Sequence, residues 1–392
     1  MVGLDGDFPG GNCVFDGVRD GVLHCRPDTP ENVSGAHWFT FIARLTGAVG
    51  PSAEICLHWP ENDPEYETDY PENRNFATVL DRTIHTSVDL VNWEPVEDVQ
   101  LEGQTARFTV ASDVKPLYVS VGIPFLPGDL EALFADAAQH PDAEVFEVAR
   151  TPRGRPVRGI RVGGGPGVKE AFYLQAFQHT QEWAGGRVIA SMVRYLLSEA
   201  GASLRTRFSW HFVPCLNLDG FLGGWREDDR GNMNRDWQRF EMPETQGVKT
   251  YIEGLRSQGL RLWHGLDLHM GWYNRASSGS GILTYELGSV SDAVVAFQED
   301  FAQHVTTWCG FSDVILRSRD PASWPTFSSW MWNAFGLPGQ TVEFSRHLFL
   351  DRDTDRWEIL RQEHEEQLGC DLADALGAFL WSVWDEDLRG HV

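Results

Sequence analysis

The stretch AFYLQAFQHTQEWAGGRVIASMVRYLLSEAG, residues 171–201, contains the transition that decides the fold. It begins with an apolar run typical of a buried strand, and it ends with apolar residues at helical spacing, closed by Gly201. Between the two, His179 and Glu182 form an H-x-x-E pair. A buried strand that runs directly into a helix is typical of α/β proteins, whose sites lie at the carboxyl ends of the strands.

Further strands and helices continue this alternation along the chain. The runs at 207–220, 262–271 and 339–345 are apolar and strand-like, whereas 127–140 carries apolar residues at helical spacing after a Pro-Gly start. We therefore predict an α/β domain over residues 126–392, with a mixed sheet flanked by helices.

Residues 1–125 have a different character. Short runs rich in β-branched and aromatic residues alternate there with Gly, Pro, Asn and Asp, which predicts an N-terminal antiparallel β-sandwich domain. The acidic, Pro-containing stretch at 61–75 interrupts these runs, and we expect a solvated loop.

Composition excludes several classes of partner. With 32 Lys+Arg and 57 Asp+Glu among 392 residues, the formal charge of −25 repels nucleic acid and anionic membrane surfaces. No apolar run approaches the roughly 20 residues of a membrane span. No basic and apolar leader is visible, and the six Cys lack C-x-x-C spacing, so we expect a cytoplasmic protein with reduced thiols.

The H-x-x-E pattern occurs twice, and its context separates the copies. His58 and Glu61 lie where a strand of the β region breaks into the acidic loop, and nothing near them in the sequence supplies a third ligand. His179 and Glu182 lie between a buried strand and a helix, and His269 ends another apolar strand. Two His and one Glu form a recurring catalytic zinc set, which leaves one position open for water.

A catalytic zinc site also needs a base and groups that hold the substrate. Glu343 lies within an apolar strand pattern, where a carboxylate is costly unless it is paired, metal-bound or functional. The loop 217–237 carries Arg226, Asn234 and Arg235, and guanidinium groups match carboxylates and developing negative charge. These arginines could equally pair with the neighbouring acidic residues Glu227, Asp228 and Asp229.

The ordered set HTQE, NLDG, GGWR, NMNRDW, DLH and TVEFS resembles the zinc metallocarboxypeptidase family, the carboxypeptidase A-like (M14) peptidases. The resemblance covers about residues 127–385. It implies one zinc ion per chain, bound by His179, Glu182 and His269. It also implies that Arg226 stabilises the oxyanion, that Asn234 and Arg235 hold the terminal carboxylate of a peptide, and that Glu343 is the general base and acid.

The N-terminal region is similar to the β-sandwich of the cytosolic carboxypeptidase subfamily. The segments at 37–47 and 85–96 match its W-F-x-F and S-x-D-x-x-x-W patterns. Leu218 departs from the family pattern, which has Pro at this place, and Met233 stands where Leu or Ala is common. The family's substrate-capping Tyr has no counterpart, because no Tyr lies between Tyr285 and Glu343. That region holds Trp324, Trp330 and Trp332 instead.

The substrate and two alternative functions stay open at this stage. A basic pocket for an acidic side chain could draw on Arg275, Arg346 and His347, none of which the sequence places. An amidohydrolase resembling aspartoacylase would use the same zinc scaffold on small N-acyl amino acids. A catalytically silent binding protein is the second alternative, and the sequence leaves the oligomeric state unknown.

Overall fold

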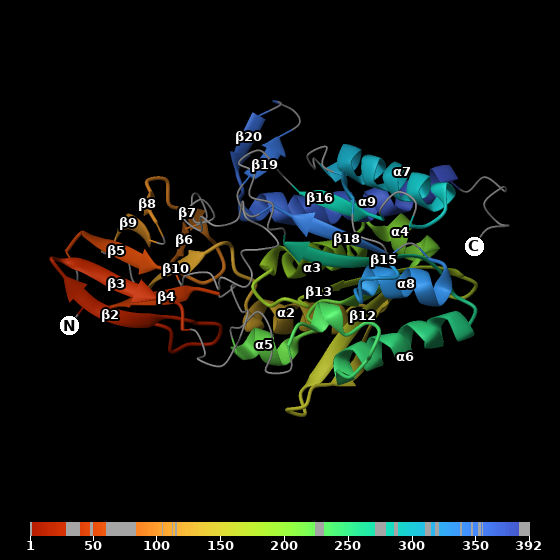
Figure 1. The fold of residues 1–392 in the computed structure, drawn as a ribbon, viewed down its shortest axis with the longest axis horizontal. Coiled ribbons are helices and arrows are strands. Elements are labelled where there is room, and N and C mark those ends of the chain that lie inside the picture. The colour runs from red at the N-terminus through yellow and green to blue at the C-terminus, as the bar shows by residue number, and fades with distance from the viewer. Residues whose placement is uncertain are drawn as a thin grey trace.

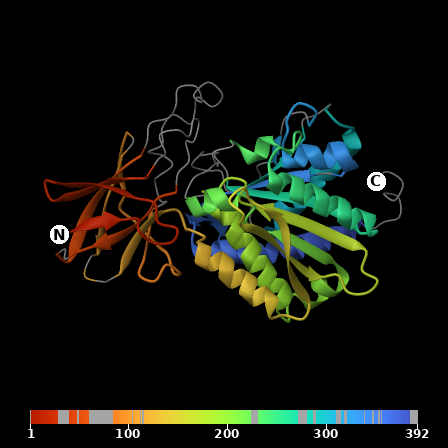
Figure 2. The same ribbon diagram turned by 90° about the horizontal axis from the view of Figure 1, so that it is seen from below.

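The computed structural model describes most of the chain, with gaps in both halves. The described residues are 2–28, 40–47, 50–59, 84–103, 105–111, 113, 116–223, 231–270, 280–285, 289–309, 315–317, 321–337, 339–345, 348–351, 354 and 356–383. The strands of residues 3–121 gather at one end of the molecule, and a larger sheet with its helices fills the other end (Figures 1 and 2).

Two five-stranded sheets form the N-terminal region. One has the order β1-β4-β10-β6-β7, and the other has the order β2-β3-β5-β9-β8. Their strands are β1 Gly3–Asp5, β2 Val14–Arg19, β3 Val22–Arg26, β4 Ile42–Thr46, β5 Ser52–His58, β6 Ile84–Ser87, β7 Glu94–Pro95, β8 Gln100–Glu102, β9 Thr105–Ala111 and β10 Leu117–Val121.

Both sheets contribute to one hydrophobic cluster, which includes Leu23 and Ile55 from one sheet and Val119 from the other. The pairing is antiparallel as expected, except between β3 and β5, which run parallel. The prediction of antiparallel pairing was wrong for β3 and β5. Parallel neighbours are joined by a crossover connection, and the alternation of residues along a strand does not show which strands are connected by a crossover.

An eight-stranded mixed sheet forms the C-terminal half, as predicted. Its order is β11-β12-β14-β13-β15-β18-β16-β17. The four central strands, β14, β13, β15 and β18, are mutually parallel, whereas β11, β12 and β16 pair antiparallel with a neighbour. The strands are β11 Ala143–Arg150, β12 Pro156–Gly163, β13 Glu170–Ala176, β14 Ser209–Val213, β15 Arg261–Met270, β16 Gly281–Thr284, β17 Ile315–Arg317 and β18 Gly339–Phe344; β19 Leu348–Asp351 and β20 Arg356–Ile359 form a separate hairpin.

Helices cover both faces of the mixed sheet (Figure 1). Helices α2, α3, α7 and α9 share one hydrophobic cluster with it, and α6 and α8 share a second cluster. The helices are α2 Pro127–Ala138, α3 Trp183–Leu197, α4 Ala202–Arg207, α5 Leu218–Gly223, the short 3₁₀ turn η3 Met233–Arg235, α6 Pro243–Ser257, α7 Asp292–Cys309, α8 Phe327–Phe335 and α9 Gln362–Val383. Among the described helices, none is both long and apolar enough to cross a bilayer.

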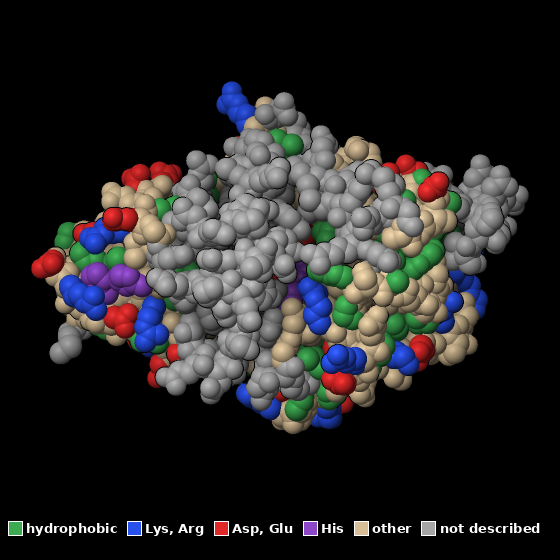
Figure 3. All heavy atoms as spheres, in the orientation of Figure 1, with side chains coloured by type: hydrophobic (Ala, Val, Ile, Leu, Met, Phe, Trp, Pro, Cys, Tyr) green, Lys and Arg blue, Asp and Glu red, His purple; other side chains and the backbone are tan. Residues whose placement is uncertain are grey.

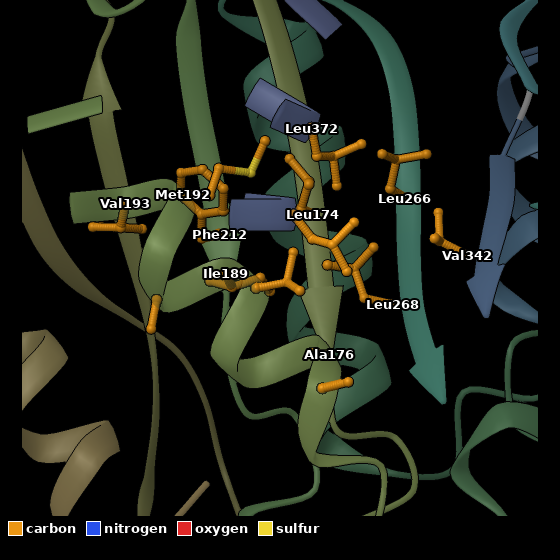
Figure 4. Close-up of a cluster of buried hydrophobic side chains, with 14 of the residues drawn as sticks. Leu174, Ala176, Ile189, Met192, Val193, Phe212, Leu266, Leu268, Val342 and Leu372 are labelled. Carbon is orange, nitrogen blue, oxygen red and sulfur yellow. The ribbon is translucent and has the colours of Figure 1, made fainter. Parts of the chain in front are cut away.

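The central strands divide their side chains between these two clusters. Leu174 and Ala176 on β13, with Leu266 and Leu268 on β15, face α3 in the first cluster (Figure 4). Tyr173 belongs to the second cluster. Successive side chains of a strand point to opposite faces, so Gln175, Asp267 and His269 are on the α6 and α8 face.

Helix α3 approaches the sheet closely because its first turn contains Gly185. A Cβ atom at this position would lie 2.8 Å from the carbonyl oxygen of Leu268 and 3.1 Å from Cβ of Ala176. The contact therefore leaves no room for a side chain at this point. It fixes the start of α3 against the ends of β13 and β15, where the candidate site lies.

Candidate metal centre

The segment between β13 and α3 turns sharply after Ala176. Phe177 adopts a φ of 60°, a left-handed conformation that is strained for an aromatic residue. The amide of Asn217 donates to the carbonyl of Phe177 at 2.9 Å and holds the turn. Glu182 then immediately precedes α3, where the helix N-terminus favours a negative charge.

Three buried side chains meet at this edge of the sheet. Nδ1 of His179 lies 3.0 Å from Oε1 of Glu182, and Nδ1 of His269 lies 2.6 Å from Oε2 of the same carboxylate. One donor atom from each residue lies within 4.8 Å of the other two. The exposed fractions of 5%, 2% and 2% for His179, Glu182 and His269 show that this donor set is almost closed to water.

The opposite nitrogen of each imidazole has its own partner. Nε2 of His269 lies 2.8 Å from Oδ2 of Asp267, and Nε2 of His179 lies 3.1 Å from Oδ1 of Asn232. Partners of this kind orient metal-binding histidines and leave the other nitrogen for the metal ion. Nδ1 is therefore the coordinating atom available on both residues.

The electrostatics of the centre favour a positive charge. Burial opposes ionisation of Glu182, but attraction from His179 and His269 outweighs it and lowers the pKa of the carboxylate. Burial also opposes charge on His269, yet Asp267 and Glu182 raise the pKa of that imidazole well above its ordinary value. The negative charge of these carboxylates, which stabilises a protonated imidazole, would also stabilise a divalent cation. The nitrogen and oxygen donors suit such a cation as well.

A buried hydrogen-bond network supports Asp267. Its Oδ2 accepts from Nε2 of Gln178, and its Oδ1 accepts from Nε2 of Gln175 at 3.2 Å. The hydroxyl of Tyr173 donates to Oε1 of Gln175 at 3.0 Å, and Nε1 of Trp237 donates to Oε1 of Gln178 at 2.7 Å. The Asp267 carboxylate is thus held by β13 and the segment that follows it, and Trp237 from the segment before α6 supports Gln178.

Strand β18 brings Glu343 next to this centre. His269 and Glu343 are register partners in the parallel pair of β15 and β18. Val342 and Phe344 belong to the cluster on the α3 face, so strand alternation places Glu343 on the face that carries His269. The side chain is half-buried at the carboxyl end of the parallel strands.

Of the three predicted loop residues, Asn234 contacts the centre, and Arg235 follows it in the chain. Nδ2 of Asn234 is 3.4 Å from Nε2 of His269. The guanidinium of Arg235 lies over the ring of Trp324, 4.5 Å from its centroid, which restrains this long side chain. Arg226 lies outside the described residues, and so do the basic-pocket candidates Arg275, Arg346 and His347.

The tryptophans expected near the missing Tyr have separate places. Trp330 is buried in the second core cluster and stacks on Trp237, with ring centroids 5.4 Å apart, so it is a packing residue. Trp332 contacts Tyr285, whose hydroxyl donates to the carbonyl oxygen of Ser328 at 2.6 Å. Trp324 contacts Arg235, one of the predicted substrate-binding residues.

Sequence reasoning missed the supporting residues Asp267, Asn232 and Gln178. The D-x-H spacing of Asp267 and His269 was a usable signal, because residues two apart on a strand share a face. The partner of His179 was harder to find, because Asn232 is 53 residues away in the chain.

Fold and donor set together define an α/β protein with a candidate His₂Glu metal centre at the carboxyl edge of its sheet. Residues 130–280 match the family model described as Peptidase_M14, zinc carboxypeptidase. Residues 130–280 therefore carry the similarity of this chain to the zinc carboxypeptidase family.

Curated relatives match only part of the chain. Zinc carboxypeptidase A 1 of Anopheles gambiae is 25% identical over 107 residues, which are 26% of this chain and 23% of the relative. Inactive metallocarboxypeptidase ecm14 of Talaromyces marneffei is 27% identical over 159 residues, which are 37% of this chain and 26% of the relative. The chain thus spans about a quarter of the length of each, and one of the two is named inactive.

Solved structures match over nearly the whole length. A metallo-carboxypeptidase from Pseudomonas aeruginosa, in complex with (2-guanidinoethylmercapto)succinic acid, is similar with a TM-score of 0.78. The match covers 97% of this chain and 99% of that one at 17% identity. This likeness shows that the chain has a metallocarboxypeptidase fold.

Proposed function

We propose that this protein is a zinc-dependent carboxypeptidase that hydrolyses the C-terminal amide bond of a peptide or peptide-like substrate. The observation that carries the proposal is the juxtaposition of the His179, Glu182 and His269 donor atoms with Glu343, the register partner of His269. The family and the fold support the same class of enzyme.

In this proposal His179, Glu182 and His269 hold the zinc ion. The ion would supply Lewis-acid activation of water. Asp267 and Asn232 orient the two imidazoles through their Nε2 atoms.

Glu343 is proposed as the group that moves protons. From the face it shares with His269, its carboxylate would take a proton from the attacking water and give it to the leaving amine. Half-buried at the rim of the sheet, it is accessible to a substrate in a way that the buried ligands are not.

Asn234 and Arg235 are proposed to hold the terminal carboxylate of the substrate. A guanidinium matches a carboxylate in bidentate geometry, and the contact with Trp324 restrains Arg235 before the substrate arrives. Arg226 is proposed to stabilise the oxyanion, on the sequence resemblance alone. The compound named with the Pseudomonas aeruginosa enzyme is a succinic acid, which fits a site that recognises carboxylates.

The accessory part of the proposal concerns residues 1–125. We propose that they form a β-sandwich domain beside the catalytic domain of residues 126–392, as in the cytosolic subfamily. The cluster that the two N-terminal sheets share supports this division. The cytoplasmic location stays a prediction from the sequence.

Hydrolysis of paired substrates tests the function. N-blocked dipeptides should be cleaved, and the activity should disappear with a chelator and return with zinc. Cleavage confined to N-acyl amino acids would favour the aspartoacylase-like alternative. Zinc binding without any turnover, across peptides that differ only in the last residue, would favour the silent alternative, which the relative named inactive keeps relevant.

A further inference from the structure

A second group of metal-binding side chains lies on the N-terminal strands, far in sequence from the first. His24 is on β3, and Cys56 and His58 are on β5. The two strands pair in parallel with His24 opposite Cys56. Cys56 and His58 are two residues apart, so all three side chains share one face of the sheet.

The three donor atoms lie close together, with the two histidines half-buried and Cys56 buried beneath them. Nδ1 of His24 is 2.7 Å from Nε2 of His58, and the two rings stack with centroids 5.1 Å apart. One donor atom from each of the three residues lies within 4.8 Å of the other two. Figure 3 shows histidine side chains at the surface over this part of the sheet, bordered by basic and acidic groups.

This arrangement bears on one expectation from the sequence. His58 belongs to the H-x-x-E copy for which no third ligand was found, and its partner Glu61 lies outside the described residues. The structure brings His24 from the paired strand β3, which the local sequence could not reveal, next to Cys56 and His58. The opposite face of these strands is packed, since Leu23, Ile55 and Leu57 belong to the core.

The surroundings permit a cation. Arg107, the register partner of Cys56, pairs with Glu54 at 2.9 Å, so its charge is offset locally. Asp16 on β2 pairs with Arg26 of β3 at 3.5 Å, and Asp16 and Arg19 act on His58 with opposite signs.

We propose that His24, Cys56 and His58 bind a divalent late transition metal ion such as Zn²⁺, at a site separate from the His179 centre. Zinc bonds of about 2.0–2.1 Å to nitrogen and about 2.3 Å to sulfur place tetrahedral donors roughly 3.3–3.6 Å apart. Small side-chain rotations bring these atoms to such spacings. Binding forms a metal–thiolate bond and releases the proton of Cys56 to solvent.

With three protein ligands, a water molecule would complete a tetrahedral site. The ion would link β3 to β5 and stabilise a strand pair that the chain does not join by a hairpin.

Cobalt substitution tests the proposal on the full-length protein. The His179 centre contains no sulfur, so a thiolate-to-cobalt charge-transfer band in the near ultraviolet distinguishes the Cys56 site from that centre. Apoprotein titrated with Co²⁺ should develop this band and saturate at one thiolate-bound ion. The band should disappear in Cys56→Ser and weaken strongly in His24→Gln and His58→Gln.

Matched variants separate this site from the first and from other thiols. His269→Ala should keep the band, because it alters only the other centre. Cys370→Ser should also keep it, since this half-buried thiol on α9 contacts Ser191 instead. His58→Gln changes a surface side chain and keeps the proposal testable if Cys56→Ser does not fold. No thiolate band in the wild type, or a band that survives in Cys56→Ser, would overturn the proposal whatever the protein's activity.

Discussion

Replacing Asp267 by Asn would remove one charge from behind the metal centre and leave the shape of the side chain almost unchanged. The carboxylate accepts from Nε2 of His269, Gln175 and Gln178. An amide oxygen in the place of Oδ2 can still accept from His269 and Gln178. The new amide nitrogen then faces Gln175, whose own amide can turn over because the hydroxyl of Tyr173 both donates and accepts.

The hydrogen bonds therefore survive, and the expected loss is electrostatic. An anionic partner increases the basicity of a metal-binding imidazole, and losing such a partner costs about 10- to 100-fold in metal affinity. This corresponds to about 1.4–2.7 kcal/mol of binding free energy. We expect zinc affinity at the His179 centre to fall by this amount.

Competition for zinc with a chelator of known affinity measures the effect. The assay is best run in a Cys56→Ser background, so that a second site does not contribute. Glu170→Gln is the matched control. This buried carboxylate links the amino ends of β13 and β15 through Arg261 and Trp263, at the edge of the sheet away from the metal centre. An Asp267→Asn protein that binds zinc as tightly as the wild type would refute the reasoning.

Three further outcomes follow from the structure. Glu343→Gln should keep zinc and lose nearly all turnover, whereas His269→Ala should lose the metal; equal zinc loss in both would mean that the proposed roles are wrong. Gly185→Ala should destabilise the fold by about 1–3 kcal/mol, since its Cβ would meet backbone, whereas Gly254→Ala in open space on α6 should be neutral or stabilising in the same denaturant titration. Burial raises the pKa of Glu365 from 4.5 to about 7, against the opposing effect of Arg187. The folded state therefore holds this proton longer than the unfolded state, and about 3 kcal/mol of stability, fully present below pH 4.5, is lost as pH rises to 7. Glu365→Gln should abolish this slope in stability measured against pH, and an unchanged slope would assign it to other groups.

The mixed sheet and its flanking helices could be predicted because the signals were local. The run at 171–201 contains a whole strand, a turn and a helix, and its apolar spacing was confirmed by β13 and α3. Strand neighbours and direction could not be obtained in this way. The parallel pairing of β3 and β5 depends on contacts across the sheet that no residue pattern records.

The ligands of the candidate centre could also be predicted from local signals, but their supporting partners could not. His179, Glu182 and His269 were recognised from their positions at strand ends, and the structure brings them together. Their supporting partners were not recognised, since Asn232 and the amides around Asp267 are ordinary polar residues until the fold places them. The group formed by His24, Cys56 and His58 was missed because only the pairing of β3 with β5 brings His24 to the other two residues.

The division of β15 between two faces limits how this protein can vary in length. Leu266 and Leu268 pack toward α3, whereas Asp267 and His269 point to the other side. Inserting or deleting one residue upstream within the strand would exchange the two sets, so that aliphatic groups would replace the imidazole and its carboxylate. Variation by insertion and deletion is therefore confined to the connecting loops, and β15 can change only by substitution.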